Sequence, residues 1–250
     1  MTETPTELVH LSVVGGIGTI TLDSQHNRNA LSRQLVTELF SALEAAEADS
    51  DVKVVVLAAE GKVFCSGADL SEAGSGDMTE GLRAINQLQR TIATSTKPVV
   101  ARVQGPVRAG GLGIVAATDV AIASAGVTFA LTEVRLGLAA YSISLSILPK
   151  MAARAASYAF LSGATFTAAE AAEWGLITTA ADDLDAELER VVGELLQGAP
   201  SGLRETKKLL NAALVARIDE LGEQMASSSA ALFASDEARE AMLAFFSRAK

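Results

Sequence analysis

The feature that most constrains the fold is an apolar run at residues 52–58, which is broken only by Lys53. A short and almost continuous apolar run is typical of a β-strand covered on both faces, because a half-exposed strand alternates apolar and polar residues. Such a strand needs helices on both sides of its sheet. The run therefore indicates an α/β architecture.

The rest of the chain repeats this alternation of strand and helix patterns. Two β-rich runs at 9–14 and 17–22 flank Gly15-Gly16, which predicts a hairpin, and leucines at every fourth position predict a helix from Leu31 to near Asp49. The later patterns predict helices at 78–94 and 110–117, strands at 99–103, 120–123 and 128–130, and mostly helix from Ser142 onward with one possible strand at 176–179. We expect helices packed on a mostly parallel sheet.

Composition excludes several classes of protein. Hydrophobic residues make up 49% of the chain and charged residues 20%, which is an ordinary globular composition. The net charge of −10 gives no general attraction for nucleic acid or anionic lipid, and an aromatic share of 4% argues against a stacking surface for single strands. We therefore expect no nucleic-acid or membrane partner, and only a local site for any anionic ligand.

Cys65 is the only cysteine, so no internal disulfide is possible and a reducing cytoplasm is expected. With His10 and His26 it leaves too few ligands for a His/Cys zinc site, and we expect no metal. The N-terminus has no basic start of a signal peptide. Residues 109–131 carry only the charge of Asp119, but glycines interrupt them, and we expect buried core there and no membrane span.

Residues 64–70 form the first candidate site, directly after the buried strand. The small residues Ser66, Gly67 and Ala68 let a ligand approach the backbone, so that amide N–H groups can act as donors. The alternative is an ordinary strand-to-helix turn in which Asp69 caps a helix.

Residues 105–113 form the second candidate site, a glycine-rich segment between a strand and a helix. Backbone N–H groups at a helix N-terminus suit an anion or a polarised carbonyl oxygen. The order Gly-Gly-x-Gly from Gly110 to Gly113 differs from the Gly-x-Gly-x-x-Gly of dinucleotide-binding turns, and the chain has no P-loop motif. A nucleotide site is therefore disfavoured.

Glu133 ends the least charged stretch of the chain. A carboxylate flanked by apolar sequence is a candidate for a raised pKa and for general acid/base work. The alternative is a glutamate that stabilises the dipole of a helix start. Neither His10 nor His26 neighbours a nucleophile motif, so a Ser-His-Asp arrangement is not supported.

In this order the segments resemble the crotonase (enoyl-CoA hydratase/isomerase) superfamily over nearly the whole chain. The resemblance is carried by Asn29 to Leu31, residues 64–70, Lys97 to Ala101, Ala109 to Gly111, Asp119, Phe129 to Gly137, Leu161 to Gly163, Ala168 to Glu173 and Gly175-Leu176.

The resemblance implies a crotonase-like spiral of ββα units over residues 1–195 and a C-terminal helical trimerisation segment over residues 196–250. It implies an acyl-CoA thioester substrate, with coenzyme A as part of the substrate and no separate cofactor. It also implies an oxyanion hole for the thioester oxygen, made by the backbone N–H groups of Ala68 and Gly110. The expected assembly is a homotrimer, or a hexamer built as a dimer of trimers, in which residues 236–250 reach a neighbour's CoA site.

The sequence departs from the family at one catalytic position. Typical hydratases of the family carry two glutamates; the second matches Glu133, the implied acid/base, while the first matches Gly113, which has no side chain. The segment after Glu133 also differs and places Tyr141 near the expected acyl pocket. The residues expected to contact the substrate or CoA are Arg28, Ser66, Ala68, Asp69, Leu70, Gly111, Gly113 and Tyr141.

A single glutamate leaves three interpretations. The first is an enoyl-CoA hydratase acting on a short or branched 2-enoyl-CoA, similar to bacterial methylglutaconyl-CoA hydratases in residues 131–135 and in the glycine at 113. The second is a Δ3-Δ2-enoyl-CoA isomerase in which Glu133 moves a proton between C2 and C4. The third is a non-catalytic acyl-CoA-binding protein. The hydroxyl groups of Tyr141, Ser142 and Ser144 favour the hydratase, because hydration needs a polar place for water.

Overall fold

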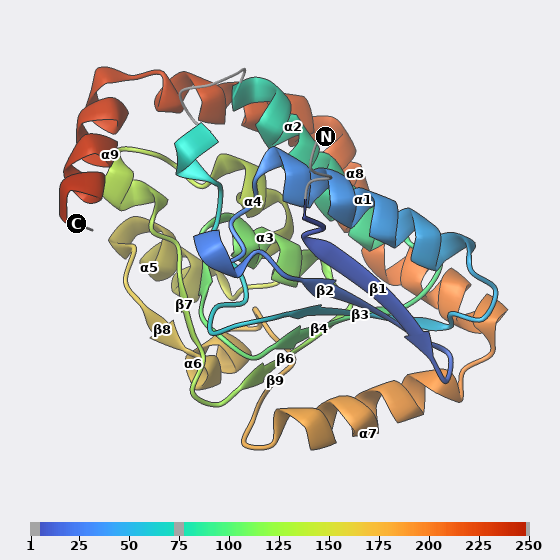
Figure 1. The fold of residues 1–250 in the computed structure, drawn as a ribbon. Coiled ribbons are helices and arrows are strands. Elements are labelled where there is room, and N and C mark those ends of the chain that lie inside the picture. Colours follow the sequence, from blue (N-terminus) through green and yellow to red (C-terminus); the bar gives the residue numbers. More distant parts are fainter. Residues whose placement is uncertain (1–5, 73–77, 249–250) are drawn as a thin grey trace.

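Two β-sheets organise the chain in the computed structural model, which describes residues 6–72 and 78–248 (Figure 1). Within these residues the larger sheet has the strand order β1-β2-β3-β4-β6-β9 and the smaller one has the order β5-β7-β8. The strands of the larger sheet are β1 Val9–Val14, β2 Ile17–Leu22, β3 Val54–Ala59, β4 Val99–Val103, β6 Val120–Ser124 and β9 Thr179–Ala181. Those of the smaller sheet are β5 Val107–Arg108, β7 Thr128–Ala130 and β8 Phe166–Thr167.

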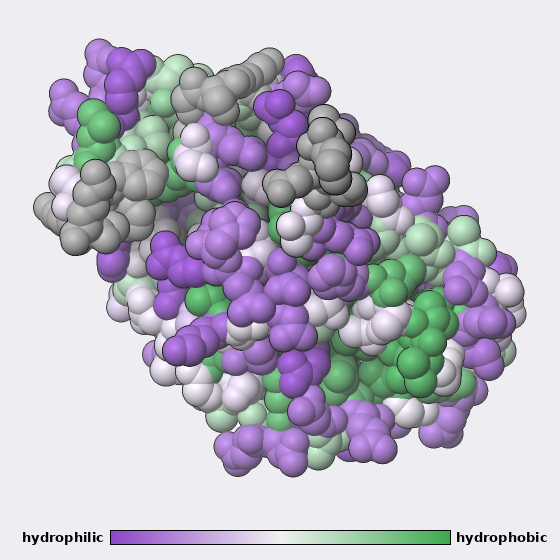
Figure 2. All heavy atoms as spheres, viewed as in Figure 1, coloured by the Kyte–Doolittle hydropathy of each residue, from purple (hydrophilic) through white to green (hydrophobic). Residues whose placement is uncertain are grey.

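The larger sheet is mostly parallel, as the sequence predicts. Only β1 and β2 are antiparallel, joined by Gly15 and Gly16, both with positive φ (60° and 87°), as a two-residue hairpin turn requires. From β2 to β9 each strand is parallel to its neighbour. The outer end of β1 is apolar, with Val14 75% exposed (Figure 2).

Helices cover both faces of this sheet (Figure 1). The helices are α1 Arg33–Ala48, α2 Met78–Thr94, α3 Gly110–Ala117, α4 Tyr141–Ile147, α5 Ala153–Ser162, α6 Ala168–Glu173, α7 Leu184–Leu196, α8 Pro200–Phe233 and α9 Asp236–Arg248. Three 3₁₀ helices within the described residues are η1 Gln25–Asn27, η2 Leu70–Glu72 and η3 Glu133–Leu136.

The two faces of β3 explain its apolar run. Val54 and Val56 pack with Val191 and Val192 of α7 on one face. On the other face Val55 and Leu57 belong to the main core, together with the leucines of α1 and α2. The prediction of a strand buried on both faces is therefore confirmed.

The observed elements differ from the sequence prediction in two boundaries and in three short elements. The first helix begins at Arg33, with Ser32 as its N-cap, because Leu31 instead pairs with Ala68 in an isolated parallel bridge. The predicted strand at 176–179 is wrong for its first part. The N–H groups of Leu176 and Ile177 both donate to Ala171 O at the end of α6, and β9 begins only at Thr179. The short strands β5 and β8 and the helix η3 were not predicted.

Residues 1–5 and 249–250, the ends of the two predicted segments 1–195 and 196–250, lie outside the described residues. Within the described part of the chain, no helix is long and apolar enough to cross a bilayer. The apolar stretch at 109–131 instead forms α3, β6 and β7, with most of its residues buried, as predicted.

The long helix α8 lies alongside α2 (Figure 1). A buried ion pair fixes it to the core. Lys207 of α8 is 4% exposed, and its Nζ lies 2.8 Å from Oδ2 of Asp119 while donating to the carbonyl oxygens of Ile92 and Lys97. The Asp119 carboxylate also accepts hydrogen bonds from Val99 N and Asn211 Nδ2. The charge noted in the apolar stretch is thus paired and fully hydrogen-bonded.

Replacing Asp119 with asparagine should lower the free energy of unfolding by about 3–5 kcal/mol, because Lys207 would stay buried without a counter-charge. Urea denaturation at neutral pH measures the loss. The matched control is Asp185→Asn, which breaks the exposed pair of Asp185 with Arg102 and should cost no more than about 1 kcal/mol. Equal losses in the two variants would contradict a special role for the buried pair.

Candidate active site

Two backbone turns meet at the centre of the site. The first, at Gly67-Ala68, follows β3, and the second, at Ala109-Gly110, follows β5. A Cβ atom added to Gly67 would lie 2.8 Å from Ala109 Cβ, and one added to Gly110 would lie 3.5 Å from Ala68 N. The two turns are therefore in van der Waals contact, and the predicted pair of N–H groups, of Ala68 and Gly110, lies on neighbouring turns.

Both N–H groups can bind a ligand as far as the described residues are concerned. Among the described residues, neither the N–H of Ala68 nor that of Gly110 donates a hydrogen bond to a protein acceptor. Gly110 is the first residue of α3, where the leading N–H groups lack partners within the helix and face the positive end of its dipole. This arrangement can stabilise an oxygen that gains negative charge.

Ala109 holds a backbone conformation that side chains disfavour, with φ 46° and ψ −121°. A non-glycine residue in such a region costs about 1–3 kcal/mol and persists only where its surroundings hold it. The N–H of Ala109 donates to Ala130 O at 3.0 Å, and that of Arg108 donates to Cys65 O at 2.9 Å. The second turn is thus tied both to β7 and to the first turn's segment.

The predicted site residues Ser66 and Asp69 join the first turn to the loop around η1. Ser66 Oγ donates to Asn27 O at 3.1 Å, and the Asp69 carboxylate accepts from Asn27 Nδ2 at 3.0 Å. Asp69 also accepts from the N–H and Oγ of Ser71, so it caps η2. Burial raises the pKa of Asp69, but hydrogen bonds from Ser71 and Asn27 outweigh it and hold the pKa below its ordinary value. These contacts make both residues supports of the turn.

Glu133 starts η3, and burial raises the pKa of its carboxyl group from 4.5 to about 7, against a small opposing effect of its own N–H. The residue is only partly buried as a whole, but its Oε2 is inaccessible and has no hydrogen-bond partner among the described residues. A carboxyl group with a pKa near neutrality can both accept and return a proton.

Strand pairing brings Glu133 towards the two turns. β5 and β7 are parallel, with Val107 opposite Phe129 and Arg108 opposite Ala130. The segments that leave their carboxyl ends, Ala109-Gly110 and residues 131–133, therefore emerge side by side. The C-terminal helix α9 packs on the same region, since a Cβ added to Gly137 would lie 3.3 Å from Ala238 N.

The space beside Gly113 is filled by an apolar side chain. A Cβ added to Gly113 would lie 2.6 Å from Ile143 Cγ2 and 2.9 Å from Ile143 Cβ. Ile143 belongs to α4 and is 4% exposed. No second carboxylate can occupy position 113 without displacing α4.

The other predicted binding residues have separate surroundings. Gly111 packs on Cys65 and Val107, Leu70 begins η2, and the Arg28 side chain is exposed. Tyr141 begins α4 and is partly buried. Among the described residues, no hydrogen bond links the side chains of Arg28 or Tyr141 to Glu133 or to either turn.

The sequence analysis missed three residues that shape the site. Asn27 joins the two loops, and Asn29, with φ 53°, donates from Nδ2 to Glu60 O and Val63 O. Two asparagines in a polar loop are a signal for left-handed backbone that could have indicated them. Ile143 gave no local signal, because its partner Gly113 lies in a different helix.

Within residues 6–72 and 78–248, no cluster of His, Cys, Asp or Glu side chains is placed to hold a metal ion. Ser144 Oγ donates to Tyr141 O, and Ser142 Oγ is buried without a partner among the described residues. Of these two serine hydroxyl groups, only that of Ser142 therefore lacks a hydrogen-bond partner within the described part of the chain.

The contact between Gly113 and Ile143 can be measured as a coupling free energy. Gly113→Ala should lower the free energy of unfolding by about 1–3 kcal/mol through overpacking, and Ile143→Ala by about 2–5 kcal/mol through lost packing. In the double variant the loss should be smaller than the sum by about 0.5–3 kcal/mol, because the shortened side chain makes room for the new methyl group. Strict additivity in urea denaturation would contradict the contact.

The raised pKa of Glu133 predicts a pH-dependent stability. The native state keeps a proton that the unfolded chain releases between pH 4.5 and about 7, so the free energy of unfolding falls as pH rises through this window. Glu133→Gln lacks this penalty and should exceed the wild type by up to about 3 kcal/mol at higher pH, with little difference in acid. Parallel stability–pH curves for the two proteins would contradict the buried carboxyl group.

Comparison with known proteins identifies the family. Residues 13–250 match the family described as Enoyl-CoA hydratase/isomerase. The crystal structure of an enoyl-CoA hydratase from Mycobacterium avium is 46% identical, covers 97% of each chain and superposes with a TM-score of 0.92. One from Mycobacterium avium subsp. paratuberculosis K-10 is 30% identical, covers 98% of this chain and 97% of its own, and has a TM-score of 0.87.

A relative with a different name is similar as well. The 4-chlorobenzoyl coenzyme A dehalogenase-2 of an Arthrobacter species is 33% identical over 208 residues, which cover 78% of this chain and 75% of the dehalogenase. The α/β crotonase fold expected from the sequence is confirmed, and the chain belongs to the enoyl-CoA hydratase/isomerase family.

Proposed function

We propose that this protein is an enoyl-CoA hydratase that adds water to a short or branched 2-enoyl-CoA, with Glu133 as its only acid/base. The observation that carries the proposal is the buried carboxyl group of Glu133, with a pKa of about 7 and an Oε2 that has no partner among the described residues. It follows β7, the strand paired with the one that leads into the turn at Ala109-Gly110. Family membership supports an acyl-CoA thioester as the substrate.

The thioester oxygen binds between the N–H groups of Ala68 and Gly110. As water adds to C3, negative charge moves onto this oxygen, and the two donors and the N-terminus of α3 stabilise the enolate. Such donors are effective because they are already oriented and need no reorganisation during the reaction. Loss of one oxyanion donor typically costs about 3 kcal/mol of transition-state stabilisation.

Glu133 performs both proton transfers in this mechanism. Its carboxylate takes a proton from water while the water oxygen bonds to C3, and the resulting carboxylic acid returns that proton to C2 of the enolate. One group suffices when both new bonds form on the same face of the double bond. A pKa near 7 suits this double role, because neither protonation state is strongly favoured at neutral pH.

A specific observation favours Δ3-Δ2-enoyl-CoA isomerisation as the second candidate. Ile143 fills the space beside Gly113, so an apolar side chain stands where a second glutamate would hold water. In that reaction Glu133 takes a proton from C2 and returns it to C4, and no water takes part. The same oxyanion hole serves both reactions, so the products decide between them.

The acyl group and the assembly belong to the same proposal. The stretch at 131–135 and Gly113 support a substrate of the methylglutaconyl-CoA type, with Arg28, Leu70 and Tyr141 as candidate contacts. We propose a cytoplasmic homotrimer, or a hexamer built as a dimer of trimers, with residues 196–250 as the trimerisation segment. Apolar side chains support such interfaces, for α5 exposes Tyr158 and Leu161, and α8 exposes Leu209 and Leu210.

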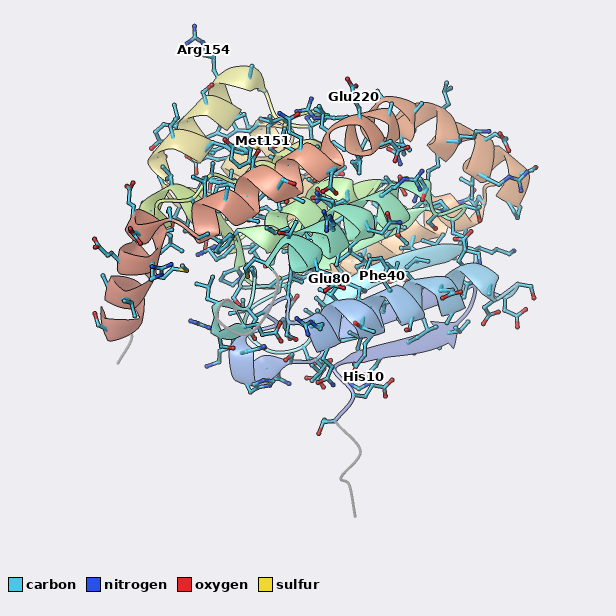
Figure 3. The ribbon with its side chains drawn as sticks, turned by 90° about the horizontal axis from the view of Figure 1, so that it is seen from above. His10, Phe40, Glu80, Met151, Arg154 and Glu220 are labelled. Carbon is cyan, nitrogen blue, oxygen red and sulfur yellow. The ribbon has the colours of Figure 1, made fainter. Side chains whose placement is uncertain are left out.

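Glu133→Gln should lower kcat by about 10²- to 10⁴-fold, because the amide keeps the shape of the side chain but transfers no proton. Binding of a saturated acyl-CoA should stay within about tenfold. In the wild type, kcat/KM should rise with pH and level off above about pH 7, where the Glu133 carboxylate is the form that activates water. The matched control is Glu220→Gln, at an exposed residue that points outward from α8 (Figure 3).

Product analysis with 2-enoyl-CoA and 3-enoyl-CoA distinguishes the candidates. Conversion of 2-enoyl-CoA to 3-hydroxyacyl-CoA, lost in Glu133→Gln, supports the hydratase. Migration of the double bond from 3 to 2 without hydration supports the isomerase. Binding without either reaction supports the non-catalytic acyl-CoA-binding protein, and an unchanged rate in Glu133→Gln would refute the role of this residue.

A further inference from the structure

Arg108 is a partly buried cation with no carboxylate partner among the described residues. Burial alone shifts its pKa below the ordinary value, and no neighbouring acid opposes the shift. Arginines in such places usually pair with a carboxylate, because an unpaired buried charge is costly. Arg102, on the neighbouring strand β4, differs in having a carboxylate partner, since it pairs with the exposed Asp185 at 2.7 Å.

The guanidinium of Arg108 is instead bound to β5 and β7. Its Nη1 donates to Thr128 O at 2.6 Å and to Val107 O at 2.9 Å, and its Nη2 donates to Thr128 Oγ1 at 2.8 Å. The planar fork thus holds the start of β7 and the end of β5 at the same time. A lysine could not reproduce this geometry, since it presents one nitrogen and not two.

The two strands need such support because they are short. β5 has only two residues and pairs with β7 through two register positions. Directly after β5, Ala109 holds its disfavoured backbone conformation, which persists only if the chain on both sides is fixed. The N–H of Gly110 comes next, and its direction depends on this conformation.

We propose that Arg108 is a positioning residue, which clamps β5 to β7 and thereby fixes the Gly110 N–H relative to Glu133. The inference rests on the proposed function, because it concerns the enolate that the proposed site stabilises. β5 leads into the turn at Ala109-Gly110, and β7 is followed by η3, which begins with Glu133, so the clamp joins the two halves of the site. Without the hydrogen bonds of the Arg108 guanidinium, the backbone of Ala109 can leave its disfavoured conformation. The N–H of Gly110 then turns away from the thioester oxygen.

Three variants test the clamp. Arg108→Lys keeps the positive charge and loses the paired hydrogen bonds of the guanidinium. Thr128→Val removes the Oγ1 acceptor but keeps the charge of Arg108 and its hydrogen bond to Thr128 O. Arg102→Lys is the matched control, because Arg102 lies on the neighbouring strand β4 and pairs with Asp185 at the surface. For each protein, kcat and KM are measured with 2-enoyl-CoA, and thermal unfolding gives the folded fraction.

A second readout reports on the oxyanion hole itself. Acetoacetyl-CoA ionises to an enolate that absorbs in the near ultraviolet, and an oxyanion hole that binds the enolate lowers the pH at which bound acetoacetyl-CoA ionises. The enolate absorbance of the bound molecule at a fixed pH therefore measures the strength of the hole without turnover. A purely structural loss leaves this value unchanged in the molecules that remain folded.

Arg108→Lys should lower kcat about 10- to 100-fold, because a small misplacement of an oriented donor costs that much, while KM stays within about threefold. The bound enolate fraction should fall with it. Thr128→Val should act in the same direction and more weakly, and Arg102→Lys should match the wild type. Unchanged kcat and enolate absorbance in folded Arg108→Lys would overturn the proposal, as would an equal loss in Arg102→Lys.

The enolate readout also separates the two proposals. A wild-type protein that turns over no enoyl-CoA but binds the acetoacetyl-CoA enolate refutes the proposed function. In that case the difference in enolate absorbance between wild type and Arg108→Lys still decides the role of Arg108. If the wild type turns over substrate and the bound enolate absorbs equally in wild type and in Arg108→Lys, only the proposed role of Arg108 is refuted. Absence of enolate binding in the wild type overturns both proposals.

Discussion

The contact between the turns at Gly67-Ala68 and Ala109-Gly110 is the constraint on which the site depends. Two backbone N–H groups can face one oxygen only if no side chain separates the turns, and the approach at Gly67 leaves no room even for a methyl group. The turns follow strands of different sheets, so the relative position of the sheets sets the position of the donors. The core of the larger sheet, covered by helices on both faces, therefore serves the site by holding β3 rigid.

Burial has two effects on the chemistry at this place. Ile143 packs against Gly113, so the candidate site has Glu133 as its one proposed acid/base. Burial of the Glu133 carboxyl group raises its pKa to about 7. A carboxyl group with an ordinary pKa would be ionised at neutral pH and a weak acid catalyst. A site without a second glutamate is therefore compatible with proton transfer in both directions, provided that both new bonds form on the same face of the double bond.

The sequence predicts those parts of the fold that carry their own pattern. The apolar run of β3, the glycine turn after β1 and the leucine spacing of α1 each depend on neighbouring residues, and each was predicted. The start of α1 was not, because Leu31 is apolar but pairs with Ala68. Two-residue strands such as β5 show no periodicity at all. The contact of Gly113 with Ile143 is equally invisible, since only the packing of α3 on α4 creates it.

The donor positions depend on side chains more than on the strand ladder. β5 is too short to hold a strained residue by backbone pairing. Arg108 and Asn29 add hydrogen bonds from their side chains to carbonyl oxygens, and Asn27 donates to the Asp69 carboxylate. Substitutions at such residues can shift the donors without changing the sheets or the core. Chains that share this fold can then differ in chemistry, as the similarity to a protein named as a dehalogenase indicates. The residues that tie loops to short strands are therefore the ones at which a difference in chemistry can arise without a change of fold.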